Sequence, residues 1–488
     1  MRKTGRLSPP RQIAPAQLRI GSYFWGWALP GALGLSLAAL VNCGGSAPQP
    51  TAQPPAPASA AAAPSGNDSP GAAEAGLEPG AALTPEPASV GCSEPCKILI
   101  GEYNQSAAKA SGLAGTAGEQ ALSVKAAAQG ERAWRGCLLR QPDPPDGACP
   151  GAGDLVSRWV ASAASAKDPD LELVAQLVLR DPRWRPQGAT VDDTRLQALM
   201  KQVKQPELAL AAQVALRDPR KVLGRVSAIK ATGKESALAQ EVLIGAADYF
   251  NQSDMAREAL SVLPKAGGTL TLQTVWLGQQ ALALWRSGQH AAALKQADKL
   301  TQGWAAADEA SRRSALARKA PHPLIGRESI VAALGIAKYL QAENLRVTAE
   351  KLKAPSTAAL KDSKQLKAYF EGPFAAWLRQ RQAALDEATE AYRDIAAVEP
   401  VPPLGWVAEG ARRVGELWQQ FSTEITQLKL PAALDKDKAS VDNFRKALVQ
   451  SVRPLSQRAR ASFEVCAGLA SKEPVGAGTR EACEQALK

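Results

Sequence analysis

Cysteine is the residue type in this chain whose number and spacing point most directly to chemistry. Of the seven cysteines, Cys43 stands apart at the end of an apolar stretch, which leaves an even set of six. Thiols pair as disulfides in oxidising compartments, where an even number is typical. We expect four of the six to pair among themselves and the last two to pair with each other: Cys92, Cys96, Cys137 and Cys149, then Cys466 and Cys483.

Zinc coordination is the alternative for the first four cysteines. A structural zinc site usually draws its thiolates from closely spaced pairs such as C-x2-C, whereas three residues separate Cys92 from Cys96 and no histidine is near. Exported proteins also rarely keep four free thiols. We therefore favour a structural role for the six cysteines, and we expect neither a metal nor another cofactor.

Residues suited to catalysis are scarce. The two histidines, His290 and His322, have no Cys, Asp or Glu at a metal-binding spacing, and the chain lacks the nucleophile-elbow, P-loop and H-E-x-x-H motifs. Carboxylates are common, but on helices they usually pair with Lys or Arg one turn away. We expect a protein that is not an enzyme and has no catalytic residue. The alternative is an enzyme with a pair of convergent carboxylates.

The segment around Cys43 resembles the signal sequence of bacterial lipoproteins. Residues 20–41 are uncharged and largely apolar, and five basic residues and no acidic one precede them. In that family the cysteine is lipidated and becomes the mature N-terminus, which implies a signal peptide over residues 1–42 and a lipid anchor at Cys43. An uncleaved transmembrane anchor and an ordinary cleaved signal are the alternatives, and all three would export the rest of the chain.

This resemblance implies a location in the cell envelope, on a membrane tether. Gly44 and Gly45 follow the cysteine, and neither is the acidic residue that retains some lipoproteins at the inner membrane. We therefore expect a lipid-anchored protein of the outer membrane that faces the periplasm. Nucleic acid is not an expected partner of such a protein, despite the net charge of +11.

Composition divides the rest of the chain into a linker and a helical body. Residues 43–91 are rich in Pro, Ala, Gly and Ser and contain no Lys or Arg, which predicts a disordered linker. Beyond it, Ala, Leu, Gln, Lys and Arg dominate, which favours helix almost throughout. We expect a cysteine-bearing segment over residues 92–150, a helical repeat domain over residues 151–325 and a C-terminal helical domain over residues 326–488.

Two internal repeats indicate an array of helical hairpins. Residues 175–183 recur 37 positions later, and in both copies Asp-Pro is expected to end an apolar helix. A second repeat of 34 residues begins at Leu243 and again at Leu277, with expected turns at residues 253–254 and 287–288. Periods of this length are typical of helical arrays.

The 34-residue repeat resembles the tetratricopeptide repeat family. A small residue lies within the first helix of each copy (Ala247, Ala281), and another opens the second helix (Ala259, Ala293). Small residues at these positions let the two helices approach closely. Neither copy has the family's Trp-Leu-Gly pattern or its closing proline. The resemblance implies an all-α, tetratricopeptide-like solenoid of helical hairpins after the disordered linker.

Residues 385–488 resemble the C-terminal helical segment of tetratricopeptide proteins linked to gliding motility in myxobacteria and related deltaproteobacteria. The residues that carry this resemblance are Trp406, Arg413, Val414, Gly415, Leu417, Trp418, Phe421 and Pro431, followed by Phe444, Arg445, Ala447, Leu448, Arg453, Pro454, Leu455, Ala459, Phe463 and Cys466. Members of that family are scaffold components of an envelope-spanning machine. The resemblance therefore implies a scaffold function and carries over no catalytic residue.

These observations predict a lipid-anchored scaffold that binds other envelope proteins. Trp276 and Trp285, on repeat helices, are the candidate partner-binding residues, although large apolar residues of repeat helices more often lie in the core. The alternative is an envelope-assembly or cell-wall factor whose basic body binds an anionic polymer. The sequence predicts no particular oligomeric state.

Overall fold

The regular elements of the described chain are helices, with no strand among them, which confirms the predicted all-α class. The computed structural model describes residues 94–116, 118–134, 154–180, 190–232, 236–265, 268–316, 327–429, 438–470 and 477–488. The predicted signal peptide and linker, and four of the cysteines, lie outside these residues: Cys43, Cys92, Cys137 and Cys149.

The first six helices pack in sequence order. The α2–α3 hairpin contacts α4, α4 contacts α5, and α5 contacts both α6 and α7. Trp134, at the end of α3, stacks on Trp159 of α4 with ring centroids 5.6 Å apart. The bounds are α2 (Glu94–Gly112), α3 (Glu119–Ala133), α4 (Leu155–Ser165), α5 (Pro169–Arg180), α6 (Asp193–Leu199) and α7 (Pro206–Ala215).

The second copy of the 37-residue repeat differs from the expectation at Asp218-Pro219. Helix α7 ends three residues earlier, and Arg217 then adopts a positive φ of 55°. The Asp218 side chain accepts a hydrogen bond from the Lys221 backbone N–H at 3.2 Å, and the proline is the first residue of α8 (Pro219–Ala231). Asp-Pro therefore starts a helix here, because aspartate is a favoured N-cap and proline is tolerated in the first turn.

The 34-residue repeat corresponds to two antiparallel helical hairpins. They consist of α9 (Ala237–Gln252) with α10 (Ala256–Val262), and α11 (Leu270–Arg286) with α12 (His290–Ala306). The turns lie at the positions predicted from the sequence. Each contains one residue in the left-handed backbone conformation: Asp254 with φ of 57° and Gly288 with φ of 83°. Helix α11 contacts both α9 and α10, so the second hairpin packs on the first. Helix α13 (Glu309–Leu316) follows.

Longer helices form the C-terminal part. Helix α14 packs on α11 and α16, and α17 pairs along its length with α18. Two glycines permit close crossings: a Cβ at Gly278 would lie 2.7 Å from the Cβ of Ala333, and one at Gly415 would lie 2.6 Å from a ring carbon of Phe463. The bounds are α14 (Arg327–Glu350), α15 (Ser363–Tyr369), η3 (Phe370–Phe374), α16 (Ala375–Arg393), η4 (Asp394–Ala397), α17 (Leu404–Thr426), α18 (Lys438–Ala470) and α19 (Ala477–Ala486).

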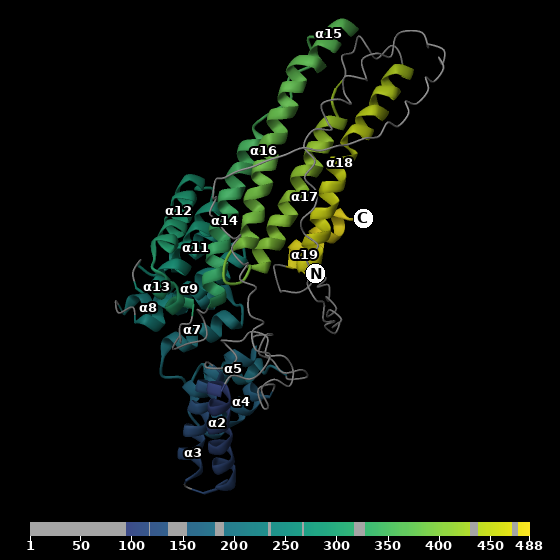
Figure 1. Cartoon of the computed structure of the whole chain (residues 1–488). Coiled ribbons are helices and arrows are strands. Elements are labelled where there is room, and N and C mark those ends of the chain that lie inside the picture. Colours follow the sequence, from purple (N-terminus) through teal and green to yellow (C-terminus); the bar gives the residue numbers. More distant parts are fainter. Residues whose placement is uncertain are drawn as a thin grey trace, which may run out of the picture.

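Buried apolar side chains form two cores that meet at α7. The first core runs from α2 to α7 and the second from α7 to α19. Helix α7 contributes Leu208 and Ala212 to the first core and Leu210 and Ala211 to the second. Figure 1 shows the resulting elongated molecule, with α2 and α3 at one end and the long helices α16, α17 and α18 at the other.

Candidate functional site

A cluster of charged side chains is buried where α14, α16 and α17 pack together. Glu343 of α14 is only 1 % exposed. The Tyr392 hydroxyl of α16 donates a hydrogen bond to Glu343 Oε1, and Arg413 Nε of α17 lies 3.3 Å from the same oxygen. Arg346 Nε donates to Glu343 Oε2 at 3.0 Å. Three helices therefore supply the donors that a buried carboxylate requires.

On α17 itself the cluster continues through Glu409, Arg412 and Glu416. Arg412 Nε donates to Glu409 Oε2 at 2.9 Å, and Arg412 also binds Glu416. Thr479 of α19 donates its hydroxyl hydrogen to Glu409 Oε2 at 3.0 Å, which attaches the last helix to the network. Burial raises the pKa of Glu409, but the hydrogen bond from Arg412 and the charges of Arg412 and Arg413 outweigh it, so the pKa lies below its usual range.

Two tyrosines complete this cluster, which we call the ionic network: Tyr339, Glu343, Arg346, Glu350, Tyr392, Glu409, Arg412, Arg413 and Glu416. The Tyr339 hydroxyl accepts from Arg413 Nε at 3.2 Å and donates to Glu409 at 3.4 Å. Burial, and then the negative charge of Glu343, raise the pKa of Tyr339 and of Tyr392 far above 10. Both phenols therefore stay protonated at neutral pH and act as hydrogen-bond donors.

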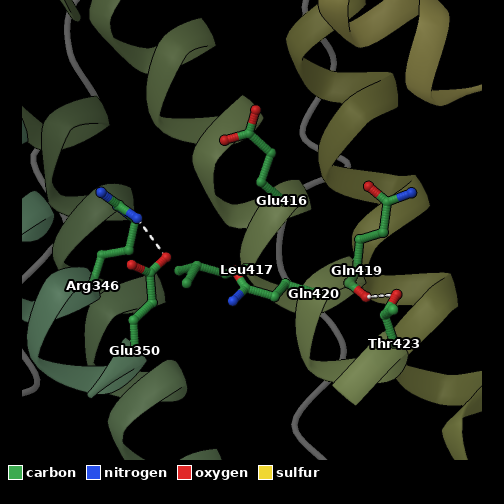
Figure 2. Close-up of a pocket in the computed structure, with 7 residues that line it drawn as sticks. All are labelled: Arg346, Glu350, Glu416, Leu417, Gln419, Gln420 and Thr423. Atoms are coloured by element: carbon green, nitrogen blue, oxygen red, sulfur yellow. Dashed lines mark hydrogen bonds and ion pairs between the residues drawn. The ribbon is translucent and has the colours of Figure 1, made fainter. Parts of the chain in front are cut away.

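Beside the ionic network lies a half-open pocket of about 450 Å³ between α14 and α17. Figure 2 shows Arg346 and Glu350 on one wall, joined by an ion pair, with Leu417 and Gln420 extending towards them from α17. Most of the lining is polar: Arg346, Glu350, Glu416, Leu417, Gln419, Gln420 and Thr423. Three of these side chains carry charge and belong to the network, so ion pairs orient part of the pocket wall.

A second ion pair, in which only the arginine is fully buried, lies next to the pocket. Arg381 of α16 is fully buried, donates to the Ala349 carbonyl, and reaches both carboxylate oxygens of Glu424 at 3.2 and 3.3 Å. Gln420 Nε2 donates to Glu424 Oε1 at 3.1 Å, which fixes the orientation of a pocket side chain. Breaking such a pair leaves an uncompensated charge and is strongly destabilising.

The chemistry that this arrangement can perform is binding of a polar group. Each of its carboxylates pairs with a guanidinium group through at least one oxygen, its tyrosines stay protonated, and no imidazole or thiol is among the residues that line the pocket. Within the described residues, no group of three or more His, Cys, Asp and Glu side chains is placed to hold a metal ion.

The structure places the predicted site residues at separate points of the fold. Cys466 and Cys483 form a disulfide that joins α18 to α19. Cys96 is buried and disulfide-bonded, and its partner lies outside the described residues. Trp276 and Trp285 are partly buried against the second core, where Trp276 Nε1 donates to the Pro264 carbonyl at 3.0 Å. None of these residues lines the pocket.

Sequence reasoning missed the ionic network, although one signal was available. Glu343 continues the buried stripe of Ile336 and Leu340 on α14, and Arg381 lies one turn before Leu385 on the buried stripe of α16. A charged residue at a core position of an amphipathic helix requires an opposite charge on a neighbouring helix.

Comparisons of this chain with protein-family models, with curated proteins and with solved structures found no match. Among the helices of the described residues, none has the length and apolar character needed to cross a membrane.

Proposed function

We propose that this protein is a lipid-anchored scaffold of tetratricopeptide-like hairpins that binds other proteins in a cell-envelope complex. Gliding motility or surface transport is the process that the C-terminal resemblance suggests. The observation that carries the proposal is the stacking of successive hairpins, in which α9 contacts α11, α11 contacts α14, and α14 contacts α17. Such an array presents an extended surface that suits the binding of peptides or helices.

The residues of the C-terminal resemblance support a scaffold because most of them serve rigid packing. Trp418 is 1 % exposed and donates its indole N–H to Thr389, while Gly415 admits the ring of Phe463. Arg413 belongs to the ionic network. A surface held in this way is preorganised, which reduces the entropy lost on binding.

The test is a pull-down from crosslinked cell envelope with the native chain and the Cys43→Ala variant as baits. We expect the native chain to retain a defined set of envelope proteins, and the variant to leave the membrane and lose them. Asn42→Ala is the matched control, because it keeps the cysteine and replaces the neighbouring residue with a small one, which lipoprotein signals usually have at that position. Equal capture and equal membrane retention by all three baits would contradict the role of the lipid anchor.

A second candidate function, binding of an anionic polymer, is favoured by the charge on α8. Arg220 and Lys221 lie in its first turn, Arg217 just before it and Arg225 at its middle, and Asp218 is the single acid between residues 217 and 230. If cell-wall polymer or lipid were retained instead of protein, and were released by salt, this basic surface would be the functional one. Changing Arg220 and Arg225 to Gln would then weaken the retention.

A further inference from the structure

We propose that the pocket between α14 and α17 receives a lysine or arginine side chain of a partner protein. The inference rests on the proposed scaffold function and names the chemistry of its partner. It is carried by the charge of the pocket and by its free hydrogen-bond acceptors, which belong to the seven lining residues drawn in Figure 2.

The charge of the pocket is negative in a chain that is strongly positive. Two carboxylates and one guanidinium line it: Glu350, Glu416 and Arg346. The ionic network behind it adds two carboxylates and two guanidiniums, so the whole arrangement keeps an excess of one negative charge. The chain as a whole carries +11. A local field of opposite sign attracts a cation from a partner and repels an acidic group.

The one guanidinium of the pocket is already engaged, whereas several acceptors remain open. Arg346 donates to Glu343 and to Glu350 Oε1, and within the described residues no donor reaches Glu350 Oε2. Gln420 commits its amide nitrogen to Glu424, which leaves its carbonyl oxygen as an acceptor. The Thr423 hydroxyl donates to a backbone carbonyl at 2.9 Å and can still accept. An ammonium or guanidinium group brings only donors and is therefore complementary.

The shape of the pocket suits a long side chain. Leu417 lies at the base of the pocket but is only 2 % exposed, so the apolar surface comes mainly from the methylene groups of the polar lining residues. The methylene stem of lysine or arginine packs well against such a surface while its charged end reaches polar groups. An anionic occupant would need an unengaged guanidinium, and Arg346 is occupied by two carboxylates.

The first arm of the test replaces Gln420 with a photoreactive amino acid in the full chain and irradiates intact envelope. The matched control places the same probe at Gln450, an exposed residue of α18 that does not line the pocket. We expect a defined product from position 420 that is absent from position 450. The crosslinked partner segment, sequenced by mass spectrometry, should contain Lys or Arg within about two residues of the link.

The second arm reverses one charge. Glu350→Lys, in the chain with the probe at position 420, should reduce the crosslink yield about ten-fold, as expected for loss of a close charge pair. Glu390→Lys makes the same charge change on an exposed part of α16 and should leave the yield unchanged. Far-ultraviolet circular dichroism and thermal unfolding establish that both variants fold.

The outcomes separate this inference from the scaffold proposal. A partner segment without a basic residue, a product that is a second copy of this chain, or an equal loss in both variants would overturn the pocket inference. No product at position 420, with envelope proteins still retained in the pull-down, would also overturn it while the scaffold proposal stands. Loss of both the crosslink at position 420 and the envelope proteins in the pull-down would refute both proposals.

Discussion

Asp248 gives the sharpest test of the electrostatics of this fold. The residue lies on α9, partly buried against α11, where its carboxylate accepts from Gln279 Nε2 at 2.9 Å and from Gln252 Nε2 at 2.8 Å. Burial raises the pKa of Asp248 from an ordinary value of 3.8 to about 6, against the opposing effect of the hydrogen bond from Gln279 and the charge of Arg286. The folded state therefore binds this proton more tightly than the unfolded chain does.

The sign of the pH dependence follows from this difference. Below pH 3.8 the carboxyl is protonated in both the folded and the unfolded state, so its burial carries no charge penalty. As the pH rises to about 6, the free energy of unfolding falls. Each pKa unit corresponds to about 1.4 kcal/mol, which sets an upper limit of about 3 kcal/mol on the destabilisation above pH 6. Because the side chain is partly exposed, solvent reduces this to about 1–2 kcal/mol.

The perturbation is Asp248→Asn, which keeps the shape of the side chain and removes its charge. Gln252 is exposed and can turn its amide oxygen towards the new donor. We expect the variant to be more stable than the parent by about 1–2 kcal/mol at pH 7.5 and equal to it at pH 3.5, as measured by urea unfolding. Asp298→Asn, an exposed site on α12, is the control. An advantage of Asp248→Asn that stays the same at both pH values would refute the reasoning.

Three further changes test the packing at Gly415, the Cys466–Cys483 disulfide and the ionic network. Gly415→Ala should destabilise the protein by about 1–3 kcal/mol in thermal unfolding, because its Cβ would lie 2.6 Å from a ring of α18, whereas Gly224→Ala, with nothing within 4 Å, should be neutral or stabilising. Cys483→Ala should cost about 3 kcal/mol and raise hydrogen exchange in α19; unchanged exchange would show that the disulfide does not hold this helix. Tyr392→Phe should cost about 1–3 kcal/mol in urea unfolding, because Glu343 loses a donor; equal stability would show that the hydroxyl contributes nothing.

The helices and the hairpin turns could be predicted from the sequence because their signals are local. The turns at residues 253–254 and 287–288 follow from polar residues between apolar stripes that repeat every 34 positions. The exact role of Asp218-Pro219 was missed for a physical reason. Asp and Pro are both compatible with the end of one helix and with the start of the next. Because α7 already ends at Ala215, Asp218-Pro219 belongs to the start of α8.

The pocket and the ionic network could not be predicted because their partners are far apart in the chain. Glu343 meets Tyr392 and Arg413 only after α14, α16 and α17 have packed, at separations of 49 and 70 residues. A charge on an apolar stripe indicates that some partner must exist. It does not identify which of the many arginines supplies it, since that depends on how closely the helices pack at glycines such as Gly335 of α14 and Gly410 of α17.

The position of α7 between the two cores has a consequence for the order of folding. In a chain that emerges N-terminus first, the N-terminal core can close around Leu208 and Ala212 as soon as α7 has emerged. At that moment Leu210 and Ala211, which pack in the second core, still await α8 and α9. A chain that pauses there would expose apolar side chains of α7, so we expect chaperones that recognise exposed apolar surface to bind it at this stage.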